Sequence, residues 1–314
     1  MFRSRIALGA AVAVLLAAGA IMAAVVPSTT TAGGTTKVGL ITKFPVAFYF
    51  SLVSGAKTWL RTVKNVQILY GQGASATDDA GEIAAIQDMI AQGVKGIAIT
   101  PVSASEIPAL TAAVHDGIKV VLLDNDLPTF TLKSSVIATD NLEGGILAGR
   151  YLATRLKPGD TLAILEGVPG VPALDDRVSG MLTGLGALKP KIKVVSELET
   201  DCDQTKGEQA AQTILTANPH LTAIYSACGP PALGAIQAIK HAGIKPGGII
   251  LVGFDGLQQE IQAVKAGIET ATVQQHPFAE GYDGLATLLD AIEGRPVPKF
   301  VNTGTGIITR ANAG

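Results

Sequence analysis

Four predicted strands of this chain lead into side chains that can exchange hydrogen bonds with a hydroxyl group. These side chains are Asp255 after the apolar run Ile249–Val252, Asp124 and Asn125 after Val120–Leu123, Gln275 after Ala271–Val273, and Thr42 after Val38–Ile41. Ligands of open α/β sheets bind beyond the carboxyl ends of the strands, so we expect these groups to face a ligand. Because no assembled nucleophile and base accompany them, the pattern favours binding over catalysis.

The sequence motifs for nucleotide, hydrolase and metal chemistry are missing from the chain. Gly71-Gln72-Gly73 lacks the third glycine of a dinucleotide fingerprint, and neither a phosphate loop, a Gly-x-Ser-x-Gly elbow nor a His-Glu-x-x-His helix occurs. The four histidines show no metal-ligand spacing; they are His115, His220, His241 and His276. We therefore expect no cofactor, no metal site and no enzymatic activity.

An aromatic stretch, Lys43–Phe50, follows the first predicted strand and opens the first predicted helix. Phe48 and Tyr49 can belong to a hydrophobic staple and the helix core. A ring at the mouth of a sheet can also pack on the C–H face of a sugar or polyol while carboxylates and amides bind its hydroxyls. This second interpretation fits the strand-end groups.

Arg177 belongs to the charged cluster Asp175-Asp176-Arg177. The two acids are favourable near the positive end of a helix, which gives the cluster a purely structural interpretation. The guanidinium of Arg177 can instead point into the crevice and bridge two hydroxyls, since its donors form a planar fork. Spacing alone leaves both interpretations open.

The composition is that of a globular α/β protein. The chain has 314 residues, 47% of them hydrophobic, with a formal net charge of -2, which suffices for two domains that each have a core. A near-neutral balance without a basic stripe argues against nucleic acid as a partner.

The N-terminus has the pattern of a targeting segment. Arg3 and Arg5 precede the apolar run Ile6–Val26, which contains the small-residue site Ala18-Gly19-Ala20. We expect residues 1–36 to be a signal peptide or an N-terminal anchor plus linker. The protein is then exported to the periplasm or cell envelope. Because about 20 apolar residues can span a bilayer, an uncleaved membrane anchor is the alternative to a cleaved signal.

Cys202 and Cys228 are the only cysteines of the chain. In an exported protein an even pair can be oxidised, and both follow predicted strands at one edge of the same domain, which favours a disulfide. The alternative is two small buried thiols.

Strand and helix patterns alternate along the chain, as in βαβ units of parallel, doubly wound sheets. The predicted strands are Lys37–Ile41, Val66–Leu69, Gly96–Ile99, Val120–Leu123, Ser135–Thr139, Thr161–Leu165, Lys193–Leu198, Ala223–Tyr225, Ile249–Val252, Thr270–Val273 and Lys299–Asn302. The predicted helices are Phe48–Thr62, Asp78–Gln92, Ala104–Asp116, Leu142–Leu156, Arg177–Leu188, Lys206–Ala217, Ala232–Ala242 and Phe278–Glu293. This number of strands predicts two similar domains.

Taken together, the residues resemble the ribose-type periplasmic sugar-binding proteins of ABC importers from Lys37 to about Thr309. The order and spacing of several segments carry the resemblance: Phe48–Leu52, Gly93–Pro101, Val121–Asp124, Ala138–Asn141 with Gly144-Gly145, Asp176-Arg177, Ala232–Ala235 and Val252–Gly256.

The resemblance implies an α/β fold of two Rossmann-like, doubly wound parallel-sheet domains joined by a three-crossover hinge, the type 1 periplasmic binding protein fold. One lobe would then comprise residues 37–139 with 276–303, and the other residues 140–275 with 304–314. By position, the family's sugar-contacting residues fall on Thr42, Phe48, Tyr49, Asp124, Arg177, Asp255 and Gln275.

Four positions depart from the family pattern. Val46 replaces an asparagine, Asn125 an arginine, Cys202 a stacking aromatic and Cys228 a polar amide. One plate of an aromatic sandwich around a flat sugar ring is then missing, which favours a smaller or acyclic ligand such as a tetritol or pentitol.

The resulting hypothesis is a monomeric solute-binding protein that closes over a small neutral sugar or sugar alcohol and delivers it to an ABC permease in the membrane. A sensor that presents its liganded form to a receptor would use the same surfaces. A repressor-type ligand-binding core is a further alternative, but it would need a DNA-reading helix-turn-helix where residues 1–36 supply an apolar run.

Overall fold

The strands form two six-stranded sheets in a computed structural model that describes residues 34–314. The expected targeting segment, residues 1–36, lies almost wholly outside the described residues. The first sheet has the order β11-β5-β4-β3-β1-β2 and the second β12-β10-β9-β8-β6-β7. The strands are β1 (Thr36–Thr42), β2 (Val66–Gln72), β3 (Gly96–Ile99), β4 (Lys119–Leu123), β5 (Ser135–Ala138), β6 (Thr161–Glu166), β7 (Lys193–Glu199), β8 (Ala223–Ser226), β9 (Ile250–Asp255), β10 (Ala271–Gln274), β11 (Phe300–Asn302) and β12 (Gly306–Thr309).

Helices connect the strands, and almost every strand pair is parallel. The helices are α1 (Ala47–Leu60), α2 (Asp79–Ala91), α3 (Ile107–His115), α4 (Asn141–Ala153), α5 (Pro172–Gly184), α6 (Gln204–Ala217), α7 (Gly229–His241), α8 (Gln258–Ala266) and α9 (Pro277–Ile292), with 3₁₀ turns at Ala104–Glu106 and Gly186–Lys191. Within the described chain only the β10–β12 pair is antiparallel. The predicted fold class, two doubly wound α/β domains, is therefore confirmed.

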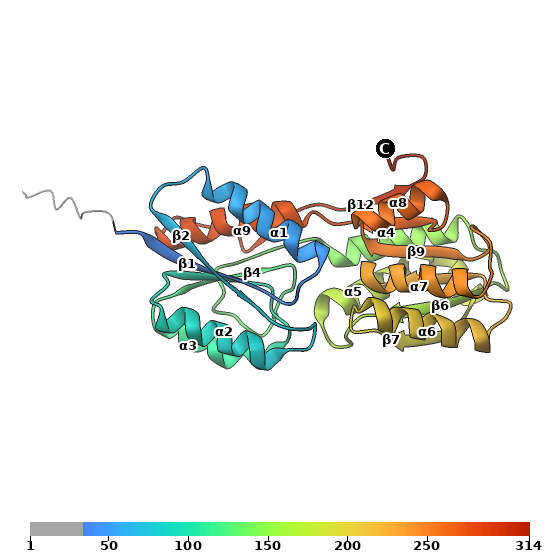
Figure 1. The fold of residues 1–314 in the computed structure, drawn as a ribbon, viewed down its shortest axis with the longest axis horizontal. Coiled ribbons are helices and arrows are strands. Elements are labelled where there is room, and N and C mark those ends of the chain that lie inside the picture. The colour runs from blue at the N-terminus through green and yellow to red at the C-terminus, as the bar shows by residue number, and fades with distance from the viewer. Residues whose placement is uncertain (1–33) are drawn as a thin grey trace, which may run out of the picture. The chain divides into compact units, whose positions relative to one another are not determined.

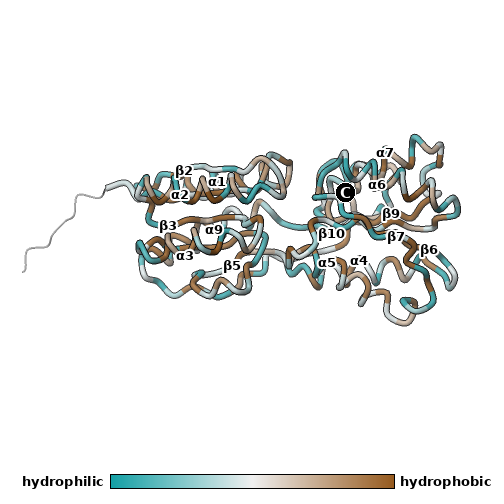
Figure 2. Tube along the Cα trace, turned by 90° about the horizontal axis from the view of Figure 1, so that it is seen from below, coloured by the Kyte–Doolittle hydropathy of each residue, from teal (hydrophilic) through white to brown (hydrophobic). Residues whose placement is uncertain are grey.

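Each sheet is covered on both faces by helices. In the lobe of the first sheet, α1 and α9 pack on one face and α2 and α3 on the other (Figure 1). In the lobe of the second sheet, α4 and α5 cover one face and α6 and α7 the other. The buried strands carry the hydrophobic residues, as the tube coloured by hydropathy shows (Figure 2). Burial on both faces explains why strands such as β3, Gly96–Ile99, are apolar throughout.

The chain passes between the two lobes three times. It crosses from β5 to α4, returns from β10 to α9, and crosses again from β11 to β12. The carboxyl ends of β4 and β9, which carry the candidate site residues, lie next to these crossings.

Three elements differ from the prediction. Helix α8, Gln258–Ala266, was not predicted because it is short and mixes polar with apolar residues; strand β12 was not predicted because it is a short edge strand. Helix α5 begins at Pro172, five residues before the predicted start at Arg177. Proline at the first helical position is a start signal that the prediction overlooked. Arg177 therefore lies in the second turn of α5, where its side chain is buried.

Helices α4 and α5 are in close backbone contact through glycines. An added Cβ on Gly145 would lie 2.4 Å from the carbonyl oxygen of Arg177, and one on Gly149 would lie 2.0 Å from that of Met181. On α5, Gly180 and Gly184 face the backbone of α4 equally closely. The distance between Arg177 and the N-terminus of α4 is therefore set by the absence of side chains at these positions.

We expect Gly145→Ala to push α4 away from α5, because the new methyl group would overlap the backbone at Arg177. Overpacking of this kind costs about 1–3 kcal/mol of unfolding free energy. Urea unfolding of the variant measures the loss. Gly306→Ala is the matched control, since no atom lies within 4 Å of the position of its added Cβ; equal stability of the two variants would contradict the close contact.

Among residues 34–314, no helix is both long and apolar enough to cross a membrane.

Candidate ligand-binding site

Asp124 and Asp255 lie at the ends of the central strands β4 and β9, one in each lobe. Both are almost fully buried, with exposed fractions of 6% and 8%. Both have positive φ, 61° for Asp124 and 99° for Asp255, a conformation that non-glycine residues rarely adopt. Such strain persists where the surrounding structure holds it and is concentrated at functional sites. The two carboxylates are thus turned out of their strands by the backbone itself.

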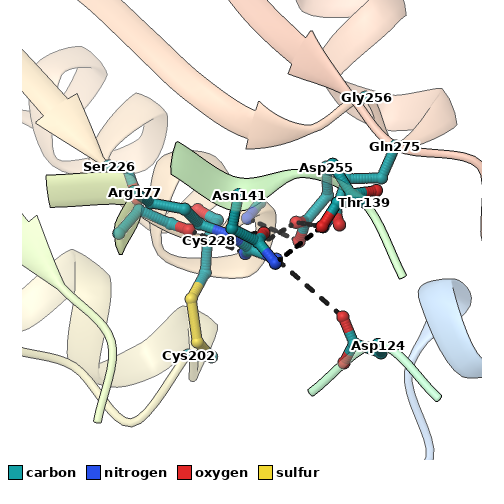
Figure 3. A network of polar contacts seen from close by, with 12 residues as sticks. Asp124, Thr139, Asn141, Arg177, Cys202, Ser226, Cys228, Asp255, Gly256 and Gln275 are labelled. Atoms are coloured by element: carbon teal, nitrogen blue, oxygen red, sulfur yellow. Dashed lines mark hydrogen bonds and ion pairs between the residues drawn. A yellow bond between two sulfur atoms is a disulfide. The ribbon is translucent and has the colours of Figure 1, made fainter. Parts of the chain in front are cut away.

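Arg177 of α5 lies between the two carboxylates (Figure 3). Its Nη1 lies 3.3 Å from Oδ1 of Asp255, and its Nη2 lies 3.9 Å from Oδ1 of Asp124. Nε donates to Oδ1 of Asn141 over 2.8 Å and Nη1 donates to the carbonyl of Ala227 over 3.0 Å. The guanidinium also stacks on the ring of Phe254 in β9, 4.2 Å from its centroid. Arg177 therefore reaches the ends of both sheets from one fixed position.

Asp255 is held by three donors. Besides Arg177, the amide of Gly229 donates to Oδ2 over 2.9 Å and Nε2 of Gln275 donates to Oδ1 over 2.7 Å. Burial raises the pKa of Asp255 although Arg177 and these hydrogen bonds oppose the shift. The other polar atom of Gln275, Oε1, is buried without a hydrogen-bond partner in the described chain. It is available as an acceptor for a hydroxyl group.

On the other lobe, Tyr49 of α1 holds Asp124. Its hydroxyl donates to Oδ2 of Asp124 over 3.0 Å. Burial, together with the charge of Asp124, raises the pKa of Tyr49, so the phenol remains a donor at neutral pH. Phe44 and Phe48 pack edge-to-face on the Tyr49 ring, with centroids 5.5 Å and 5.2 Å away. The aromatic stretch thus supplies both the core of α1 and an aromatic wall.

These residues line a cavity whose space outside protein atoms, about 570 Å³, includes open solvent at its mouth. Of the predicted ligand-binding residues, the cavity is lined by Phe48, Tyr49, Asp124, Asn125, Arg177, Asp255 and Gln275. Asn125 lies at 4% exposure, and its Nδ2 donates to the carbonyl of Pro101 over 3.3 Å.

Thr42 does not line the cavity. Its side chain is fully buried, lies 2.7 Å from the hydroxyl of Tyr70 and accepts a hydrogen bond from Nε2 of Gln72 over 3.0 Å. Both partners belong to β2, so Thr42 ties the ends of β1 and β2 together. Thr42 therefore lies at the end of β1, as predicted, but its side chain hydrogen-bonds to β2 and does not line the cavity.

Lys43 lines the cavity and was not among the predicted binding residues. Its residue exposure is 5%, and burial lowers its pKa while the charge of Asp124 opposes the shift. Asn141 was also overlooked as a residue of the site, although its Oδ1 accepts from Nε of Arg177 and so fixes the orientation of the guanidinium. Lys43 directly follows Thr42 at a strand end, and this position was the available signal.

Cys202 and Cys228 are joined by a disulfide, and both line the cavity. They pack against Val168, Val171 and Leu174. The cavity lining is therefore of two kinds: the carboxylates, the guanidinium and the amides are polar, and the disulfide with its apolar neighbours forms part of an apolar wall. Such a surface suits a small molecule that carries hydroxyl groups on a carbon skeleton.

A fold of two α/β lobes with a cavity between their strand ends defines a bilobal solute-binding protein. A family model described as the periplasmic binding protein domain matches residues 38–296. The chain belongs to this periplasmic binding protein family. The predicted resemblance is thereby confirmed.

Individual relatives support the assignment. The chain is 31% identical to the ribose import binding protein of Bacillus subtilis over 226 residues, which cover 72% of each chain. Among solved structures, a solute-binding protein from Burkholderia graminis in complex with D-arabinose superposes with a TM-score of 0.83 at 27% identity, covering 89% of this chain and 96% of the other. One from Mycobacterium smegmatis with bound glycerol gives a TM-score of 0.81 at 27% identity, with the same coverage.

Proposed function

We propose that this chain is an extracytoplasmic solute-binding protein of an ABC importer and binds a small neutral sugar or sugar alcohol. The proposal rests on one observation: Asp124 and Asp255, which belong to two different sheets, both form ion pairs with the buried guanidinium of Arg177. The names of the relatives, which include ribose and D-arabinose binders, support the same class of ligand.

The charges of the cavity favour a neutral ligand. The cavity is lined by two basic side chains, Lys43 and Arg177, and by two carboxylates, Asp124 and Asp255. None of the four residues is more than 8% exposed. A charged ligand would leave one buried charge without a partner, which is costly in a cavity of low dielectric. Hydroxyl groups, by contrast, both donate to the carboxylates and accept from the cations.

Hinge closure is the proposed mechanism. The three chain crossings allow the lobes to rotate, and a ligand that bonds Asp124 in one lobe and Asp255 in the other stabilises the closed form. The 3.9 Å gap between Nη2 of Arg177 and Asp124 is too long for a hydrogen bond, and a ligand hydroxyl can occupy this position.

We infer that the protein is exported, since the family is periplasmic and an apolar run, Ile6–Val26, precedes the domain. The run serves either as a cleaved signal or as an anchor in the cell envelope. The proposed partner is an ABC permease that receives the ligand from a monomer, with no role for nucleic acid. Presentation of the closed form to a sensory receptor would use the same binding event.

Calorimetric titration with a panel of neutral compounds tests the proposal. We expect at least one of erythritol, xylitol, D-ribose, D-arabinose and D-allose to bind with a dissociation constant of about 10 μM or tighter, equivalent to about −7 kcal/mol. D-Ribose 5-phosphate is the charged control and is expected not to bind. Failure of the entire neutral panel, or a preference for the phosphate, would overturn the assignment of a neutral ligand.

A further inference from the structure

The Cys202–Cys228 disulfide connects two loops that belong to strands which are not neighbours. Cys202 follows β7 and Cys228 follows β8, while β6 lies between these strands in the sheet. The bond therefore passes over the end of β6. A Cβ on Gly167, just beyond β6, would lie 3.0 Å from Sγ of Cys202 and 3.2 Å from Sγ of Cys228. Three consecutive loops of this sheet edge are thus packed around one disulfide.

The residues on either side of Cys228 hold the two charged groups of this lobe. The carbonyl of Ala227 accepts from Nη1 of Arg177 over 3.0 Å, and the amide of Gly229 donates to Oδ2 of Asp255 over 2.9 Å. The carbonyl of Cys228 accepts from the hydroxyl of Ser226 over 2.7 Å. The segment Ala227–Gly229 therefore positions Arg177 and Asp255 through backbone atoms, whose places depend on the loop conformation.

The loop at the other end of the bond has an uncommon conformation. Asp201 and Cys202 both have positive φ, 50° and 51°, which costs free energy for residues with a side chain. Outside the disulfide, the loop is held by an ion pair between Lys206 and Asp201 and by the cap of α6 at Asp203. The fully buried Thr200 also ties it to the end of β6, because its amide and its hydroxyl both donate to the carbonyl of Glu166. These contacts tie the loop to β6 and α6, whereas the disulfide is its covalent connection to the Ala227–Gly229 segment.

We propose that the Cys202–Cys228 disulfide is a positioning bond of the ligand site: it holds the Ala227–Gly229 segment against Arg177 and Asp255. Two-electron reduction by a dithiol breaks the S–S bond and leaves two thiols, while the dithiol is oxidised to a cyclic disulfide. The segment then gains freedom and ligand affinity falls while the lobe stays folded. The affinity part of this proposal rests on the proposed function; the backbone part does not.

The test compares oxidised protein, protein reduced with dithiothreitol, and the double variant Cys202→Ser/Cys228→Ser. Amide exchange followed by NMR should be at least ten-fold faster at Gly229 in the two forms without the bond, and within two-fold of the oxidised protein at Ile164, a buried residue in the middle of strand β6 of the same sheet. Titration with D-ribose and erythritol should show at least a ten-fold weaker affinity for whichever compound the oxidised protein binds. Dithiothreitol should not change the double variant further.

Two results would overturn the proposal. Exchange at Gly229 and affinity that both stay within two-fold would show that the bond does not position the site. Equal acceleration at Gly229 and Ile164 would show that the bond acts on the stability of the whole lobe. If neither D-ribose nor erythritol binds the oxidised protein, the exchange rates still decide the positioning role, and the failure falls on the ligand assignment.

Discussion

Replacement of Arg177 by methionine is expected to abolish measurable sugar or polyol binding and to lower the free energy of unfolding by about 3–5 kcal/mol, the cost of breaking a buried charge pair by removing one partner. Methionine keeps much of the volume but removes the donors to Asn141, Ala227 and Asp255. Asp255 would then stay buried without its cation. Because burial already raises the pKa of this carboxyl, the variant should lose less stability at pH 5 than at pH 8.

Urea unfolding and calorimetric titration measure the two effects. Arg150→Met is the matched control, because Arg150 lies on α4, is 66% exposed and pairs only loosely with Glu143 at 3.6 Å. Exposed ion pairs contribute about 0–1 kcal/mol, so this variant should bind and unfold like the unchanged protein. Retention of ligand affinity by Arg177→Met would show that the guanidinium does not contact the ligand.

The second large expected effect is a dependence of stability on pH. It arises from the buried carboxyl pair Glu82 and Glu106, which lies near Lys43 in the first lobe. Both carboxylates accept from the amide of Val102, over 3.2 Å and 2.9 Å, and both are fully buried. Burial and the neighbouring charge of Glu106 raise the pKa of Glu82 to about 10. The pair therefore shares a proton across the neutral range.

The raised pKa makes stability depend on pH. A carboxyl with a raised pKa in the folded state binds an extra proton on folding, so its contribution is complete below the unfolded value of about 4.3 and is lost as pH rises towards the folded value. The free energy of unfolding should fall by up to about 1.4 kcal/mol per pH unit in this window for one such proton.

Glu82→Gln isolates this contribution, because the amide can donate to Glu106 as the protonated acid does. We expect the variant to have a flatter stability profile between pH 5 and pH 8 than the unchanged protein, measured by urea unfolding at each pH. Glu143→Gln, at an exposed acid of α4, should leave the slope unchanged. Identical slopes for Glu82→Gln and the unchanged protein would contradict a shared proton.

The sequence predicted the fold class and most of the polar side chains that line the cavity, because both follow from local patterns. Apolar runs such as Val120–Leu123 can be buried only in a sheet covered on both faces, and the residue after such a run lies at the ligand edge. This argument located Asp124, Asn125, Asp255 and Gln275 at the cavity. The residues at strand ends can thus be predicted from a single sequence.

The remaining features depend on the direction of single side chains, which strand patterns do not give. Thr42 and Lys43 are adjacent at the end of β1, yet Thr42 bonds to β2 and Lys43 lines the cavity. The positive φ of Asp124 and Asp255 is likewise imposed by tertiary structure. Helix α8 was overlooked because it is short and its apolar residues, which include Ile261, Ala263 and Val264, are interspersed with polar ones.

The central claim is that one neutral polyhydroxyl ligand bridges the strand ends of both lobes. A crystal structure with the tightest-binding compound of the panel tests it most directly. We predict one ligand molecule whose hydroxyl groups lie within about 3 Å of the carboxylates of Asp124 and Asp255, with Arg177 donating between them. A ligand that contacts only one of the two carboxylates, or that binds outside this cavity, would contradict the account.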